Sequence, residues 1–140
     1  MPSPPIAASP ALSVAASGLK AQQARMRVIA ENIANADSTA TVAGGDPYRR
    51  QSPQFKPTAV GGGATGVEMT GVTPDQAPFK KEYNPSHPAA DPQGYVKMPN
   101  VDALTEALDM RQAQRAYEAN LNVIETARTM QSRTLDLLKR

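Results

Sequence analysis

The residue types that most often carry out chemistry are few in this chain and lie far apart. His87 is the only histidine, and cysteine is absent. A lone histidine with Asp91 nearby does not predict a metal site, because zinc sites need three or four ligands. A nucleophilic triad would have only this histidine as its base. The acidic residues occur singly, so a pair of catalytic carboxylates is not expected. These residues favour a protein that is not an enzyme.

The glycine-rich and basic stretches do not indicate a bound ligand either. The run Gly61–Gly66 (GGGATG) lacks the Lys-Ser/Thr of a phosphate loop and does not open a helix, so it is not expected to bind phosphate. We interpret Gly61-Gly62-Gly63 as a flexible turn. Arg49-Arg50 and Lys80-Lys81 are short basic clusters in a chain whose formal net charge is only +2. We therefore predict no cofactor, no metal, no nucleic acid and no small-molecule substrate.

The composition allows only a small hydrophobic core. The chain has 140 residues and is 40% hydrophobic, but much of this is alanine, with two Phe and no Trp. No stretch is long and apolar enough to predict a transmembrane span. Residues 1–10 have no basic start and no apolar run, so a signal peptide is not expected.

Prolines and glycines divide the chain into four parts. Residues 1–10 contain four of the 13 prolines and are predicted to be a flexible N-terminal tail. Residues 11–43 and 100–140 are predicted to be helical and to form one discontinuous assembly core. Residues 44–99 contain most of the proline and glycine and are predicted to be irregular, with short β strands. The expected fold is mainly α, with paired, coiled-coil-like terminal helices and a small irregular or β middle segment.

The C-terminal helix, predicted over 100–140, contains neither proline nor glycine and would be about 60 Å long. Asn100 follows Pro99 and is expected to cap its first free amides. Apolar residues at three- and four-residue steps form one stripe on this helix, while Val101, Leu104 and Leu108 fall on the opposite side. The stripe consists of Met110, Ala113, Tyr117, Leu121, Ile124, Ala127, Leu135 and Leu138, and Gln131 interrupts it. The rest of the chain is too poor in large apolar residues to cover both faces, so we expect neighbouring molecules to do so.

The N-terminal helix, predicted over about 11–36, carries apolar residues at sevenfold spacing. Such spacing predicts a coiled-coil seam formed by Leu12, Leu19, Met26 and Ile33. Gly18 costs about 1 kcal/mol in a helix interior, so this helix needs a partner. Near its end, Asn32 and Asn35 have two interpretations, a frayed helix end or assembly contacts, and the residues alone do not separate them.

The middle segment has weak strand signals. Val67–Thr73 alternates weakly in polarity, and Phe79–Tyr83 is predicted to pair with it across Pro74–Pro78. The proline-rich segment 84–99 is expected to run extended along a surface.

Four motifs give the chain a family resemblance. Ser17–Thr39 contains S-G-L-x-A-Q-Q and A-E-N-I-A-N-A-x-S-T, and Ala116–Ile124 reads AYEANLNVI. This pair resembles the flagellar axial protein family, whose members build the rod, hook and junction of the bacterial flagellum. Two further stretches, Pro47–Gln51 (PYRRQ) and Gly94–Val101 (GYVKMPNV), are similar to a proximal-rod subunit of that family. The similarity covers about residues 12–140. Residues 1–10 depart from it, because relatives usually open with bulky apolar residues.

The resemblance implies a structural subunit of the basal-body rod. Such a subunit polymerises through its terminal helices to form the proximal rod, which transmits torque and encloses the export channel. The resemblance also implies export through the flagellar type III apparatus without a signal peptide. The implied partners are copies of the chain, other flagellar rod proteins, and the junction with the membrane ring and export gate. The residues expected at assembly contacts are Leu12, Leu19, Met26, Asn32, Ile33, Asn35, Leu104, Leu108, Tyr117, Asn120, Leu121, Ile124, Leu135 and Leu138 on the helices, and Tyr48, Arg49, Arg50 and Tyr95 in the middle segment.

Two alternative functions remain open at the level of sequence. The chain could be a sister axial subunit, from another part of the rod or from the hook. Only the motifs at 47–51 and 94–101 argue against this alternative. A coiled-coil binding or regulatory module would need one apolar helix face rather than two.

Overall fold

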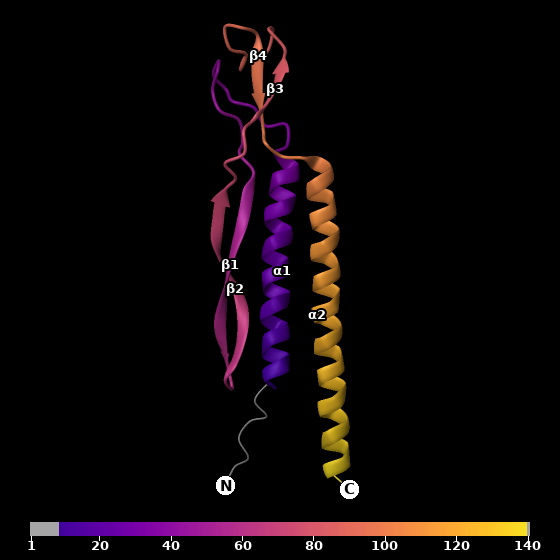
Figure 1. Ribbon diagram of the computed structural model, residues 1–140. Coiled ribbons are helices and arrows are strands. Elements are labelled where there is room, and N and C mark those ends of the chain that lie inside the picture. The colour runs from indigo at the N-terminus through magenta and orange to yellow at the C-terminus, as the bar shows by residue number, and fades with distance from the viewer. Residues whose placement is uncertain (1–8, 140) are drawn as a thin grey trace. The chain divides into compact units, whose positions relative to one another are not determined.

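Along the sequence, one long helix precedes four strands and a second long helix follows them (Figure 1). The computed structural model describes residues 9–139. The elements are α1 (Pro10–Ala34), β1 (Gln51–Gly61), β2 (Ala64–Pro74), β3 (Lys80–Tyr83), β4 (Tyr95–Met98) and α2 (Ala103–Leu138). The predicted terminal helices and small β middle segment are thus confirmed, whereas most of the predicted tail, residues 1–8, lies outside the described residues. Within 9–139, neither helix combines the length and the apolar character that crossing a membrane requires.

Local polar contacts set the ends of α1. Pro10 suits the first turn because its φ is already fixed near the helical value. The Ser9 hydroxyl accepts a hydrogen bond from the amide of Leu12 at 3.2 Å and so caps this end. At the other end, the Asn35 side chain donates to the carbonyl of Glu31 at 2.8 Å and accepts from the Ser38 hydroxyl at 3.0 Å. The helix ends at Ala34, two residues before the predicted end, because these bonds replace the next helical turn.

The prediction that Asn100 caps the C-terminal helix is wrong. Asp102 does so, since its carboxylate accepts from the Leu104 amide at 3.1 Å and from the Thr105 hydroxyl at 3.2 Å. The bond from the Leu104 amide is the main reason that the pKa of Asp102 lies below its usual value. Asp102 directly precedes the first helical residue, whereas Asn100 lies too far back along the chain to reach the free amides.

The predicted pairing of the strands is also wrong. β2 pairs with β1 rather than with β3, and β3 pairs antiparallel with β4, from Lys80 opposite Met98 to Tyr83 opposite Tyr95. The turn between β1 and β2 is the glycine run, in which Gly61, Gly62 and Gly63 have φ values of 94°, 61° and 75°. Only glycine adopts such values readily, so this run favours a hairpin at this position.

The prolines of the middle segment are compatible with these strands. Pro53 and Pro57 lie four residues apart in β1, so their missing N–H groups fall on the same edge of a two-stranded ribbon. The segment 84–99 was predicted to be extended, but it contains turns and then β4. The amide of Asn84 donates to the carbonyl of Gly94 at 2.9 Å, which closes the loop between β3 and β4.

Contacts divide the chain into two compact units, and both helices contribute to each. Among the described residues, unit 1 contains 9–25, 55–70 and 112–139, and unit 2 contains 26–54 and 71–111. The buried apolar residues of unit 1 are Ala15, Ala21 and Ala113, and those of unit 2 are Val28, Ile29, Ala89, Val96 and Val101. Alanine contributes little apolar area, so the larger side chains of unit 1 are not in its core.

Candidate assembly surface

In unit 1, α1 lies between the β1–β2 hairpin and α2 (Figure 1). On the α2 side, a Cβ added to Gly18 would lie only 2.8 Å from the side-chain nitrogen of Asn120. Nearby, the Arg25 guanidinium donates to the Gln112 side chain at 3.1 Å. Gly18 therefore weakens the isolated helix but allows α2 to approach closely, and it joins the two stretches that carry the family resemblance.

On the hairpin side, a second glycine allows close contact. A Cβ on Gly66 would lie 2.3 Å from the Ser17 hydroxyl oxygen. That hydroxyl accepts from the amide of Val67 at 3.2 Å and donates to the carbonyl of Val14 at 2.7 Å. The backbone of β2 is thereby fixed directly onto α1.

The seven-residue seam predicted on α1 is not closed within the chain. Leu12, Leu19 and Met26 are half-buried, and Ile33 is 40% exposed. The fully buried α1 positions of unit 1, Ala15 and Ala21, are alanines that do not belong to the seam. Coiled-coil pairing through these four residues therefore stays a prediction.

The α2 leucines expected at assembly contacts are covered to different extents, and none of the five is buried. In unit 1, Tyr117 and Ile124 of the predicted stripe are half-buried, as is Asn120, which was expected at an assembly contact. The leucines of the same stripe are more accessible, with exposed fractions of 37% for Leu121, 40% for Leu135 and 76% for Leu138. In unit 2, Leu104 is 70% exposed and Leu108 is 57% exposed. Each unit therefore covers its own leucines only in part, and Leu104 and Leu138 least of all.

In unit 2, Asn32 fastens the last turns of α1 to the segment before β1. Its side-chain oxygen accepts from the Tyr48 hydroxyl at 2.7 Å and from the Gln51 amide at 2.9 Å, while its nitrogen donates to the Gln51 carbonyl at 2.8 Å. Asn32 is only 1% exposed, so these three bonds satisfy an otherwise costly buried amide. Burial, followed by the charges of Glu31 and Glu106, raises the pKa of Tyr48.

Arg50 joins the hairpin base to the start of α2. Its guanidinium donates to the fully buried carboxylate of Glu106, and it lies 3.4 Å from a carboxylate oxygen of Asp75 and 3.6 Å from one of Asp109. Burial by itself would lower the pKa of Arg50, but the hydrogen bond and charge of Glu106, with those of Asp75, outweigh it and raise the pKa. A guanidinium with three carboxylates around it is held in one place.

Asn100 completes this polar cluster. Its oxygen accepts from the Arg50 amide at 2.7 Å, and its nitrogen donates to the carbonyls of Asp75 and Ala77, both at 3.0 Å. Asn100 therefore fixes the base of the hairpin rather than the end of a helix.

The other two middle-segment residues make aromatic contacts. The Arg49 guanidinium lies 4.1 Å from the centre of the Phe79 ring and donates to the Asp75 carbonyl at 2.8 Å. The rings of Tyr83 and Tyr95 meet edge to face with their centres 5.3 Å apart. A Cβ at Gly94, whose φ is +88°, would lie 2.9 Å from the Tyr83 ring.

The polar groups of unit 2 hold α1, the base of the hairpin and the start of α2 in place, and their arrangement does not suggest a catalytic reaction. Between residues 9 and 139 no three His, Asp or Glu side chains are grouped so that they could hold a metal ion. The three sequence motifs at 32–35, 47–51 and 94–101 instead meet in one network, through Asn32, Arg50 and Asn100. Among their exposed residues the helices also leave several large apolar side chains uncovered, as in a protein that is completed by its neighbours.

Comparison with known proteins agrees with this arrangement. Residues 12–40 match the family model described as "Flagella basal body rod protein", and residues 93–137 match "Flagellar basal body rod FlgEFG protein C-terminal". A protein of Agrobacterium fabrum is 47% identical over 94% of this chain and 95% of its own length. Relatives from Escherichia coli O6:H1 and Bacillus subtilis are 46% and 34% identical, over 89% and 91% of this chain and 92% and 96% of their own lengths. All three are named flagellar basal-body rod protein FlgC.

The chain belongs to the FlgC family. It is therefore a structural subunit of the flagellar basal-body rod and not an enzyme, and it assembles with other rod components. The FlgC resemblance of the motifs at 47–51 and 94–101 is confirmed.

Sequence reasoning missed two features of this FlgC-family chain. One is Glu106, the buried partner of Arg50, which resembled any other acidic residue in the first turn of a helix. The other is a second apolar series on α2, Val123, Met130 and Leu137, whose exposed fractions are 47%, 64% and 69%. Its seven-residue spacing was the signal that could have revealed it.

Proposed function

We propose that this FlgC-family chain polymerises through the exposed faces of α1 and α2 to form the proximal rod. The observation that carries the proposal is the exposure of Leu104 and Leu108 in unit 2, beside a polar network that already holds α2 in place. Burying a leucine side chain contributes about 1.5–3 kcal/mol, so a neighbour that covers both would be strongly favoured. Unit 1 has exposed leucines of its own on another face of α2, namely Leu121, Leu135 and Leu138.

The mechanical role follows from this assembly. Helices packed side by side into a closed tube transmit torque along the rod and enclose the export channel. The partners of the chain are then copies of itself, other rod proteins, and the junction of the membrane ring with the export gate. Delivery would be as an unfolded chain through the flagellar type III apparatus, and the small alanine core of unit 1 suits a subunit that completes its packing after export.

Two finer points belong to the same proposal. Coiled-coil-like pairing through Leu12, Leu19, Met26 and Ile33 would form between subunits, because these residues are half-buried or exposed in the chain itself. A coiled-coil regulatory module is less well supported, since α2 leaves apolar residues uncovered on more than one face.

Leu104→Asp tests the proposal in a flagellated strain that lacks its own copy of this protein. Because Leu104 is exposed, the substitution should leave the subunit folded and secreted, while an unpaired carboxylate in a packed interface costs several kcal/mol. We expect swimming to be lost and the rod to be incomplete, as seen by electron microscopy of isolated basal bodies.

Leu104→Met is the matched control and should preserve swimming, because it keeps an apolar side chain of similar volume. Normal swimming by the Leu104→Asp strain would contradict the proposed use of this face.

A further inference from the structure

The series Val123, Met130 and Leu137 forms a ridge on α2 that the described residues of unit 1 leave largely exposed, although Ala11 of α1 lines a groove together with Val123 and Met130. All three side chains are about half or more exposed, and their seven-residue spacing places them on one side of the helix. The ridge is about 21 Å long at 1.5 Å per residue. Arg133 lies between Met130 and Leu137 in sequence, on the same side of the helix, and gives the ridge a positive charge.

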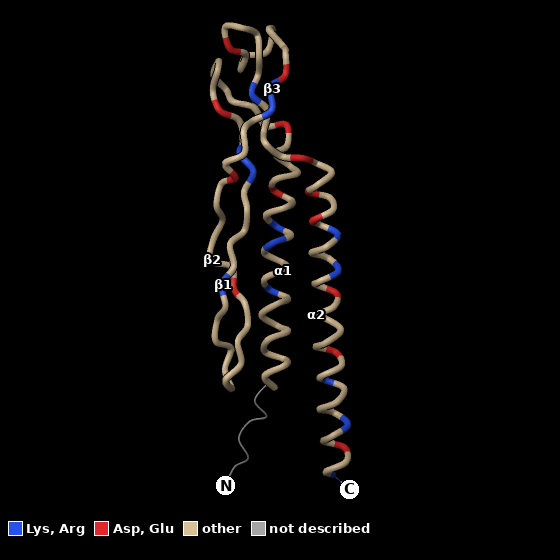
Figure 2. Tube along the Cα trace, in the orientation of Figure 1, with Lys and Arg blue, Asp and Glu red and all other residues tan. Residues whose placement is uncertain are grey.

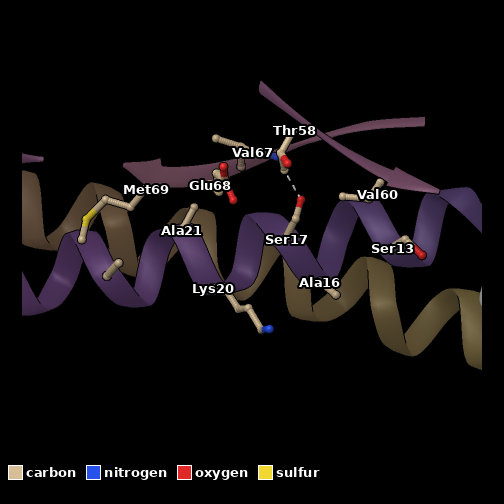
Figure 3. Close-up of a pocket in the computed structure, with 11 residues that line it drawn as sticks. Ser13, Ala16, Ser17, Lys20, Ala21, Thr58, Val60, Val67, Glu68 and Met69 are labelled. Atoms are coloured by element: carbon tan, nitrogen blue, oxygen red, sulfur yellow. Dashed lines mark hydrogen bonds between the residues drawn. The ribbon is translucent and has the colours of Figure 1, made fainter. Parts of the chain in front are cut away.

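A trough of matching character lies between α1 and the hairpin in the same unit (Figure 3). Its volume is about 660 Å³, and its α1 side is lined mainly by small side chains, which include Ser13, Ala16 and Ala24. Val67 and Met69 of β2 line the opposite wall. The bond from the Val67 amide to the Ser17 hydroxyl fixes this wall in place. From Ser13 to Ala24 the trough follows the helix for about 17 Å.

The two surfaces also offer one pair of opposite charges, Glu68 in the trough and Arg133 beside the ridge. The hairpin wall of the trough carries Glu68, whose side chain is 48% exposed and lies 3.3 Å from Lys56. These two are the only charged residues of the hairpin within unit 1 (Figure 2). Lys20 also lines the trough, on its α1 side, but its side chain extends away from the hairpin (Figure 3). A ridge that carries Arg133 would meet a carboxylate on this wall.

We propose that the ridge Val123–Met130–Leu137 of one copy packs into the α1–hairpin trough of a second copy. This inference rests on the proposed function, because only an assembly supplies the second copy. Large side chains on one helix that enter a groove floored by small ones give close helix packing. The ridge is exposed, so the trough of its own chain does not hold it.

Cross-linking tests the contact directly, because the natural chain contains no cysteine. Full-length Ala16→Cys and Met130→Cys chains are produced together in a strain without its own copy, and isolated basal bodies are treated with a short thiol cross-linker. We expect a covalent dimer with one chain of each kind. Ala24→Cys and Val123→Cys test the other registers in the same way.

Glu125→Cys is the matched control, since Glu125 is exposed on α2 but lies well away from the ridge on the helical wheel. Two results would overturn the inference: equal cross-linking of this control, or no dimer in any register although the variants are present in the basal bodies. Neither result would contradict the rod function. Absence of the natural chain from basal bodies would instead contradict the proposed function.

An exchange of charges keeps the inference testable if the cysteine variants do not assemble. We expect Glu68→Lys and Arg133→Glu each to reduce swimming several-fold, and the two together in one chain to restore it. Glu68→Lys places a second positive charge beside Lys56. Arg133→Glu can compensate for that charge only if residue 133 of another copy lies against the hairpin wall. Failure of the double variant to swim better than either single one would count against the contact.

Discussion

At the scale of single residues, the motifs of the chain act by fixing its own backbone. Asn32, Tyr48 and Arg50 were picked out from the family resemblance, and each has partners within unit 2. Sequence could not pair them, because the partners lie 16 to 56 positions away along the chain. The burial of Glu106 likewise depends on tertiary packing, which a helical wheel does not show.

Replacing Asn32 with alanine should destabilise unit 2 by about 2–3 kcal/mol. The change leaves the Gln51 amide and carbonyl and the Tyr48 hydroxyl without their partner in a buried place. Hydrogen exchange at residues 47–54 should become faster. Asn35→Ala, which removes only local bonds at the helix end, is the control, and an equal effect of both would contradict the account.

Arg50→Ala should be more damaging, by about 3–5 kcal/mol, because it leaves the buried carboxylate of Glu106 without its charged partner. The additional change Glu106→Gln removes that charge and should recover part of the loss. Urea unfolding of the single and double variants measures both effects, and a double variant no more stable than Arg50→Ala would be inconsistent with a buried ion pair.

The raised pKa of Tyr48 predicts a loss of stability at alkaline pH. Since the folded state has the higher pKa, this contribution is fully present below the unfolded value of 10.0 and is lost as the pH rises through the folded value. The ionised oxygen could no longer donate to Asn32. Tyr48→Phe should therefore unfold with a weaker pH dependence than the natural chain above pH 10, and identical profiles would exclude this role.

At the scale of elements, the helices could be predicted and the strand pairing could not. The scarcity of proline and glycine in 11–36 and their absence from 100–140 placed both helices to within three residues at each end. The pairing of β1 with β2 depends on the positive φ values of Gly61, Gly62 and Gly63, whereas Pro53 and Pro57 obscured β1 as a strand. Short segments with weak alternation do not specify their partner, because pairing is set by turn geometry and by the surface beneath.

Gly66→Val should move the hairpin away from α1. A Cβ at this position would lie 2.3 Å from the Ser17 oxygen and 2.7 Å from the Val60 side chain, so either these side chains or the backbone of β2 must shift, and the Ser17 bond to β2 is disturbed in both cases. We expect loss of protection from hydrogen exchange at residues 64–70 and a strong decrease in swimming. Thr65→Val, at an exposed position of the same strand, should have neither effect. Unchanged exchange in Gly66→Val would rule out this contact.

At the scale of the whole molecule, the main feature is the apolar surface that the free subunit cannot bury. The core of unit 1 consists of alanines, while leucines along α2 stay exposed. The sequence indicated this from its composition, because a chain with 4% aromatic residues has little large apolar surface for a core of its own.

The purified subunit should therefore be marginally stable at its helices. We expect weak hydrogen-exchange protection over residues 11–36 and 100–140 at low concentration, and strong protection of the same residues in assembled rods. Strong protection in the dilute subunit would show that the helices do not need neighbours.

In the proposed rod, the chain assembles through helix faces that a single copy leaves exposed. Cryo-electron microscopy of isolated basal bodies that contain this chain is the most direct test of this assembly. We predict density for the chain in the proximal rod, with α1 and α2 in the wall of the tube and with Leu104 and Leu108 covered by a neighbouring subunit. A rod in which these leucines face solvent, or in which the chain is absent, would contradict the account.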